Sequence, residues 1–221
     1  MVILATKCYV DGEARHRALD GMNSLVDNAV GDLAVEYDVG VRNDEFVAVT
    51  LSGPDEIAGR NLLREQWGEV TPHFEAGETY VGTLEGWTDD GWVLDAGEAV
   101  HVARDDLGLG PGDPGQLRER FGVVQHTPLS FVAGDEPALA DAARDRLYDW
   151  TRGEGRVNVN SATRGEVRAT VNRAGHARDI VTVERLGLSE QSIVCRADTD
   201  PPGLLAAVGA HLPAELKAVV P

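Results

Sequence analysis

Hydrophobic and polar positions over the first seventy residues follow strand and helix periods in turn. Apolar residues recur three and four apart from Ala14 to about Asn28, which predicts an amphipathic helix. Pro54 opens a second helical pattern, at a position where its missing N–H donor costs little. β-rich or alternating runs predict strands at residues 2–10, 33–39 and 46–51. The order β-α-β-β-α predicts a split βαβ sandwich over residues 1–72.

The middle of the chain loses the helical period. Residues 77–102 carry short strand patterns and many glycines, and Asp90-Gly91 is a strong hairpin signal. The runs that match an S1-type oligonucleotide-binding barrel are Val81-Gly82-Thr83-Leu84, then 91–97, then 100–107. A glycine- and proline-rich loop at 108–115 precedes a closing strand at 128–132. Residues 73–134 therefore resemble a small S1/OB-like β-barrel.

The last third of the chain repeats the plan of the first. Residues 137–150 have one apolar face and predict a helix that links to the final block. Beyond it, strand patterns lie at 156–160, 179–184, 191–196 and 216–220, and helix patterns at 163–173 and 202–211. This β-α-β-β-α-β order predicts a ferredoxin-like sandwich within residues 135–221, and the fold class of the chain is α+β.

Charge is the most unusual feature of the composition. The 37 acidic residues outnumber the 20 basic ones, for a formal net charge of −17, and Lys7 and Lys217 are the only lysines. Such self-repulsion opposes compaction, but at molar salt the Debye length falls to about 3 Å and screens it. We therefore expect a salt-adapted protein of the cytoplasm. A net-acidic chain in high salt gains little from counterion release, so we expect no strong nonspecific nucleic-acid binding.

The two cysteines and the apolar segments give further expectations. Cys8 and Cys195 lie far apart within strand patterns, which favours two buried, reduced thiols over a disulfide or a metal pair. The apolar start of the chain is too short to cross a bilayer and lacks the basic residues of a signal peptide, and no later run is long enough. We expect no membrane partner.

Arginine is concentrated in one window of the chain. Residues 151–197 hold eight arginines and five acidic residues, so this window is net +3 within a chain of −17. On the predicted helix, Arg164, Arg168 and Asn172 form a row at four-residue spacing. Guanidinium groups bind phosphate through a bidentate fork, so the row is a candidate nucleic-acid or partner site, together with Arg156, Arg173, His176 and Arg178. The alternative is that these arginines pair with neighbouring carboxylates on a solvated surface.

Three aromatic residues of the barrel candidate form a second possible site. Tyr80, Trp87 and Trp92 lie in its predicted strands, and aromatic rings on an open barrel face stack on bases with about 1–3 kcal/mol each. Trp87 and Trp92 flank the hairpin, so cross-strand packing is the alternative.

No arrangement of residues predicts catalysis. His176 precedes Asp179 after a helix that ends near Gly175, but no nucleophile accompanies them. Asp198 and Asp200 precede a helix start, where capping explains them better than a metal. The chain has no P-loop, no dinucleotide-binding glycine motif and no paired C-x-x-C. We expect no catalytic residue, metal or cofactor.

Several runs resemble an archaeal family known as domain-of-unknown-function family 2110. They are Gly175-His176-Ala177-Arg178-Asp179-Ile180, Glu184-Arg185-Leu186-Gly187-Leu188 and the run 194–200. The resemblance extends to Ala5-Thr6-Lys7 and to the hairpin at 82–97. It implies a haloarchaeal source and carries over no activity, ligand or catalytic residue.

The sequence favours one function and leaves two alternatives. The leading hypothesis is a non-enzymatic binding protein of archaeal information processing, in which the barrel and the arginine-bearing block contact RNA or an RNA–protein assembly. One alternative is an enzyme or a regulator that binds a metal or small ligand between modules, using His176, Asp179, Asp198 and Asp200. The other is a scaffold that binds protein partners through sheet edges or sandwich faces.

Overall fold

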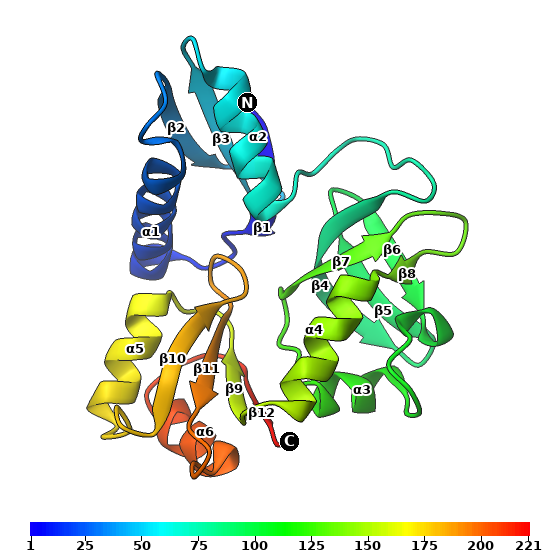
Figure 1. Cartoon of the computed structure of the whole chain (residues 1–221), viewed down its shortest axis with the longest axis vertical. Coiled ribbons are helices and arrows are strands. Elements are labelled where there is room, and N and C mark those ends of the chain that lie inside the picture. Colours follow the sequence, from blue (N-terminus) through cyan, green and yellow to red (C-terminus); the bar gives the residue numbers. More distant parts are fainter.

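Three antiparallel sheets divide the protein into three modules. The structure is a computed structural model that describes residues 1–221, and we call residues 1–72, 73–152 and 153–221 the N-terminal, central and C-terminal modules. Figure 1 shows them grouped around a common centre, with the central module beside the other two. The α+β class is confirmed.

The N-terminal module has the predicted β-α-β-β-α order. Its elements are β1 (Val2–Lys7), α1 (Gly12–Val30), β2 (Glu36–Val41), β3 (Phe46–Ser52) and α2 (Glu56–Trp67), and the sheet order is β1-β3-β2. Beyond α2, the Val70 N–H bonds to the Ile3 carbonyl and the Ala5 N–H to the Gly68 carbonyl. The segment that leaves the module therefore lies along the free edge of β1.

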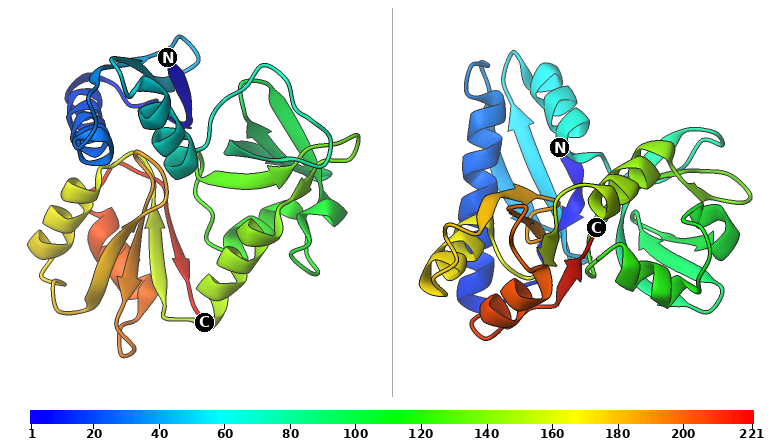
Figure 2. Two further views of the ribbon diagram at one scale, coloured as in Figure 1. Left: turned by 45° about the horizontal axis from the view of Figure 1, so that its top comes forward. Right: turned by 60° about the horizontal axis from the view of Figure 1, so that its bottom comes forward.

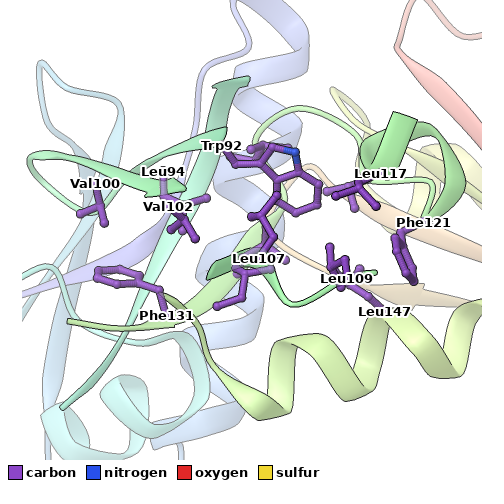
Figure 3. Close-up of a cluster of buried hydrophobic side chains, with 14 of the residues drawn as sticks. Trp92, Leu94, Val100, Val102, Leu107, Leu109, Leu117, Phe121, Phe131 and Leu147 are labelled. Carbon is purple, nitrogen blue, oxygen red and sulfur yellow. The ribbon is translucent and has the colours of Figure 1, made fainter. Parts of the chain in front are cut away.

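The central module is a curled sheet of five strands. The strands β4 (Thr79–Thr88), β5 (Gly91–Asp95), β6 (Ala99–Ala103), β7 (Pro128–Val132) and β8 (Ala138–Leu139) are arranged in the order β6-β5-β4-β7-β8. A 3-10 turn (Arg104–Leu107), α3 (Pro114–Arg120) and α4 (Asp141–Arg152) complete it. Figure 3 shows Trp92, Leu107 and Phe131 packed inside the curl, with Leu147 reaching in from α4. The helix predicted as a linker is thus part of the central core.

One helix of this module was not predicted. The glycine- and proline-rich segment after residue 107 contains α3, and Asp113 caps it by accepting a hydrogen bond from the Gln116 N–H at 2.8 Å. The Gln116 side-chain oxygen in turn accepts a hydrogen bond from the Asp113 N–H at 3.1 Å. Asp-Pro followed by Gln at the third helical position is a capping signal that the glycines around it obscured.

The C-terminal module contains the six predicted elements in the predicted order. They are β9 (Arg156–Val159), α5 (Arg164–Arg173), β10 (Ile180–Arg185), β11 (Gln191–Cys195), α6 (Pro201–Gly209) and β12 (Leu216–Val219), and the sheet order is β10-β11-β9-β12. Both helices pack on one face of the sheet around a core that includes Val157, Val183 and Cys195. Figure 2 shows the central module beyond the other face. Because β10 is an edge strand, one side of its backbone has no neighbouring strand.

Both lysines of the chain form ion pairs between modules. Lys7 Nζ lies 2.7 Å from Asp95 and 3.2 Å from Glu85, which joins β1 to the central sheet. Lys217, on β12, pairs with Glu119 of α3, and Arg118 of α3 pairs with Glu215. Lys7 and Lys217 are 6% and 9% exposed, so these lysines join modules instead of forming part of a solvated surface.

The hairpin loop between β10 and β11 contacts both other modules. Leu188 is buried in the N-terminal core, and its N–H bonds to the Thr6 hydroxyl at 3.0 Å. Leu186 packs against the central core. Glu190 is 1% exposed and accepts a 2.5 Å hydrogen bond from the Tyr9 hydroxyl. This short loop therefore joins the C-terminal module to both other modules.

Candidate nucleic-acid interface

A groove lined by arginines lies between α4 and the edge strand β10. Its volume is about 500 Å³. α4 contributes Arg146, Asp149 and Trp150, and the C-terminal module contributes Arg156 of β9, Arg164 at the start of α5, and residues 182–186 of β10, among them Arg185. We call this the arginine groove. It has four arginines and two acidic residues, which is a local excess of positive charge in a chain of −17.

Most arginines of the C-terminal window have no carboxylate partner. Of the eight between residues 151 and 197, Arg156 alone forms a salt bridge, to Glu184 at 2.5 Å. Outside the window, seven of the ten arginines form one, and they are Arg17, Arg42, Arg60, Arg64, Arg104, Arg118 and Arg144. Pairing with neighbouring carboxylates therefore accounts for most arginines elsewhere in the chain, but for only one of the eight in this window.

Local structure holds Arg164 at the groove. Thr163 caps α5 by accepting from the Glu166 N–H, and the Glu166 side chain accepts from the Thr163 N–H at 2.9 Å. Arg164 follows directly, and its Nε donates to the Val183 carbonyl on the open side of β10 at 2.7 Å. One edge of the guanidinium is therefore fixed to the sheet, while the side chain stays exposed.

Like charges lie close together in the groove. Burial, with the nearby charge of Arg164, lowers the pKa of Arg185, and burial lowers the pKa of Arg146. The guanidinium carbons of Arg146 and Arg156 each lie 5.7 Å from the centre of the Trp150 ring, which is 3% exposed. The indole holds two cations by cation–π attraction without neutralising either. An anion in the groove would relieve this repulsion.

The Nε atoms of Arg146 and Arg156 are buried and have no acceptor. Arg146 Nη2 donates to the Pro128 carbonyl at 2.7 Å, which anchors the side chain while Nε stays unpaired. A buried donor without a partner costs about 1–3 kcal/mol. Both side chains line the arginine groove, although these two Nε atoms are themselves shielded from solvent.

The other arginines predicted as site residues lie outside the groove. Arg168, Asn172 and Arg173 are exposed along α5, and Arg178 is exposed in the loop after it. Arg168 continues the row one turn beyond Arg164, roughly 6 Å along the axis. The structure thus brings Arg156 and Arg164 into the groove and leaves Arg168 outside it on α5.

His176 is tied to its own loop. Its Nδ1 lies 2.6 Å from Asp179 Oδ2, and Gly175 has the left-handed conformation expected after a helix end. Asp200 caps α6 by accepting from the Gly203 N–H at 3.0 Å, as predicted. None of the residues His176, Asp179, Asp198 and Asp200 lines a principal cavity between modules.

The barrel aromatics do not form a common surface. Trp92 is fully buried, and its Nε1 donates to the Pro114 carbonyl at 2.9 Å, so this candidate for base stacking was wrong. Trp87 pairs with Trp92 across the hairpin, is 39% exposed and carries the Arg118 guanidinium 3.6 Å from its ring centre. Tyr80 packs on Phe74, with ring centres 4.8 Å apart. Cross-strand packing explains the tryptophans.

A second polar cluster joins the modules. Tyr9 stacks on His126 with ring centres 3.8 Å apart, donates to Glu190 and accepts from the Ser161 N–H at 2.9 Å. His126 and Ser161 both have positive φ, 66° and 57°, which non-glycine residues rarely adopt. Burial raises the pKa of Glu190 to about 8. None of these four residues lines a principal cavity, so we interpret the cluster as a contact that locks the modules together.

Sequence reasoning missed Arg146, Trp150 and Arg185 as members of the site. The first two lie on a helix expected to be a linker, 35 or more residues before Arg185. The alternation of apolar and polar residues along β10 correctly places Val183 towards the helices. It does not show that the edge of this strand lies opposite α4. An arginine four residues before a tryptophan on one helix face was the available signal.

Other observations concern cysteines, metals and membranes. Cys8 and Cys195 are both buried and free, as expected. The structure contains no group of three or more histidine, cysteine, aspartate or glutamate side chains that could hold a metal ion. None of its helices has the length and apolar character needed to cross a bilayer.

Comparison with known proteins identifies a family and no activity. Three family models match in succession: the DUF2110 N-terminal domain over residues 1–73, the DUF2110 central domain over 74–151 and the DUF2110 C-terminal domain over 154–220. No curated protein matches the chain.

Proposed function

The chain belongs to the DUF2110 family, and we propose that it is a non-enzymatic binding protein of archaeal information processing that contacts RNA, free or within an RNA–protein assembly, through the arginine groove. The observation that carries the proposal is that Arg146, Arg164 and Arg185 line one groove and have no carboxylate partner. Self-repelling cations in a strongly acidic chain cost stability, and an anionic ligand would offset that cost.

Phosphate is the anion that fits these groups best. Guanidinium offers a rigid fork of donors that matches phosphate oxygens, and unlike a lysine it stays charged when partly buried. The row from Arg164 to Arg168 leads out of the groove along α5, which favours a chain of phosphates over a single ion. With Trp150 buried and Trp92 inside the core, base stacking contributes less to the interface than phosphate contacts do.

The finer fold assignments support the same proposal. We propose that the C-terminal module is a ferredoxin-like sandwich, which its strand order β12-β9-β11-β10 and the two helices on one face support, and that the curled central sheet is an S1/OB-like barrel. Both architectures occur among RNA-binding modules. The groove lies between these two modules, so the RNA would contact both.

The test is fluorescence anisotropy of a labelled single-stranded RNA across a potassium chloride series. Arg164→Glu with Arg168→Glu is expected to weaken binding at least tenfold, because it replaces two phosphate contacts with two repulsions. Arg60→Glu with Arg64→Glu is the matched control, since it makes the same charge change at the same spacing on the exposed helix α2.

Two outcomes would overturn the proposal. One is that the wild-type protein, even in large excess, binds no RNA at any potassium chloride concentration of the series, from low salt to molar salt. The other is an equal loss of affinity in the α5 pair and the α2 pair, which would mean that overall charge, and not the groove, determines binding.

A further inference from the structure

One arginine of the groove is already bound by a carboxylate of the same chain. Arg156 Nη1 lies 2.5 Å from Oε2 of Glu184, and both residues line the arginine groove. The other three arginines of the groove, Arg146, Arg164 and Arg185, form no such pair. Glu184 therefore occupies one of the four cations that an RNA phosphate would contact.

The pair lies on the face of the C-terminal sheet that the helices leave open. Val157 and Val183 belong to the core under the helices, so the alternation along each strand turns residues 156 and 184 to the opposite face. Arg156 is on β9 and Glu184 on β10, with β11 between them. The Arg156 side chain crosses β11, and its Nη1 also donates to the Ser192 hydroxyl at 3.2 Å. Ser192 is the cross-strand neighbour of Glu184, so the carboxylate meets the guanidinium at the groove side of the sheet.

The two partners differ in how firmly they are held. The Arg156 side chain is 16% exposed, and its guanidinium lies against the Trp150 ring and bonds to Ser192. The Glu184 side chain is 46% exposed on an edge strand, and its hydrogen bond to Arg156 is the only one it makes. A carboxylate so exposed regains water when it moves away, so the separation costs little while the arginine stays in place.

A phosphate group competes with Glu184 for the same guanidinium. Arginine binds carboxylates and phosphates through the same fork of N–H donors. A phosphate that reaches Arg156 must displace Glu184 or share the cation with it, and sharing brings two negative groups together. In both cases the Glu184 carboxylate lowers the affinity of the groove for an anion.

From this geometry we propose that Glu184 is an autoinhibitory group of the arginine groove, which neutralises Arg156 in the free protein and moves into solvent when an RNA phosphate takes its place. The inference rests on the proposed function and names the residue that limits its affinity. Removing the charge of Glu184 is therefore expected to raise the affinity for RNA by more than the loss of one negative charge from the groove explains.

Asp149 provides the matched control for this test. It is the other acidic residue of the groove, and it is exposed and forms no salt bridge. Glu184→Gln and Asp149→Asn each remove one negative charge and keep the size of the side chain, and both positions are exposed enough for the fold to be retained. Anisotropy of the labelled single-stranded RNA at one potassium chloride concentration is expected to show about three- to fivefold tighter binding by Glu184→Gln than by Asp149→Asn, the gain from releasing one exposed ion pair.

A third substitution identifies the cation responsible. In an Arg156→Gln background, adding Glu184→Gln is expected to change the affinity no more than adding Asp149→Asn does, because no paired guanidinium remains to be released. Equal gains from Glu184→Gln and Asp149→Asn when Arg156 is present would overturn the inference and leave RNA binding by the groove intact. An advantage of Glu184→Gln that persists without Arg156 would do the same.

Titration calorimetry with sodium tripolyphosphate keeps the inference separate from the proposed function. If none of these proteins binds RNA but Glu184→Gln binds tripolyphosphate more tightly than Asp149→Asn does, RNA is refuted as the ligand and Glu184 is supported as the competitor of a different anion. If none binds RNA and tripolyphosphate binding is equal in the two variants or absent from both, the proposed function and the inference both fail.

Discussion

Replacing Glu190 with glutamine is expected to change how the stability of the protein depends on pH. Glu190 is fully buried, and its pKa is raised from 4.5 to about 8, first by burial and also by the charge of Glu85. The folded protein therefore keeps a proton that the unfolded chain releases above about pH 4.5. Stability consequently falls as pH rises from about 4.5 to about 8, and it levels off above that range.

The size of the effect follows from the shift. At about 1.36 kcal/mol for each pKa unit, the rise corresponds to roughly 5 kcal/mol of stability lost across the window. For a chain of 221 residues this corresponds to a melting temperature about 10 °C lower at pH 9 than at pH 5. Glutamine keeps an oxygen to accept from Tyr9 and cannot ionise, so the variant is expected to lose most of this pH dependence.

Differential scanning calorimetry of both proteins between pH 5 and pH 9 measures the effect. Glu85→Gln is a comparison variant whose effect should lie at acid pH. Burial raises the pKa of Glu85, but hydrogen bonds from His126 and Thr83 outweigh burial and lower this pKa to about 2. The stabilisation from Glu85 is present above its unfolded pKa and is lost as pH falls towards 2, so this variant should act mainly on the acid side. It also removes a charge that helps to raise the pKa of Glu190, so it should reduce the loss of stability between about pH 4.5 and pH 8 far less than Glu190→Gln does. If the melting temperatures of wild type and Glu190→Gln fall by the same amount between pH 5 and pH 9, the reasoning is refuted.

Two further predictions concern stability. Raising potassium chloride from 0.1 M to 2 M is expected to raise the melting temperature by several degrees, because shortening the Debye length from about 10 Å screens the repulsion within a chain of −17; a flat or falling curve in a salt titration by circular dichroism would contradict salt adaptation. Leu188→Ala is expected to cost about 2–5 kcal/mol in denaturant unfolding, because Leu188 is 3% exposed in the N-terminal core. The same change at exposed Leu62 should cost under 1 kcal/mol, and a similar cost at both positions would argue against the loop as the anchor between modules.

Secondary structure was predictable where one element had one clear period. All six elements of the C-terminal module follow from apolar stripes such as Val167 and Val171 on α5, which face the strands. α3 was missed because its capping residues lie among glycines. The ends of the first two helices differed by two residues or so, since helix ends depend on caps that periodicity does not describe.

The candidate site was only partly predictable, because its residues meet through packing between modules. The composition of the window identified Arg156 and Arg164, while Arg146 approaches from α4 and no periodicity links it to β10. The hairpin tryptophans show the same limit. Their cross-strand pairing could be predicted from the hairpin. The difference in burial could not, because both residues fit the same alternating pattern, although Trp92 is fully buried and Trp87 is 39% exposed.

The salt dependence of RNA affinity tests the central claim most directly. For a single-stranded ligand, the logarithm of the binding constant falls with the logarithm of the salt concentration by about 0.7 for each phosphate contact. Arg164→Gln with Arg185→Gln is therefore expected to make the slope shallower by about 1.4, while Arg60→Gln with Arg64→Gln leaves it unchanged. If the groove pair gives the wild-type slope, or both pairs change it equally, the arginine groove is not where this protein binds RNA.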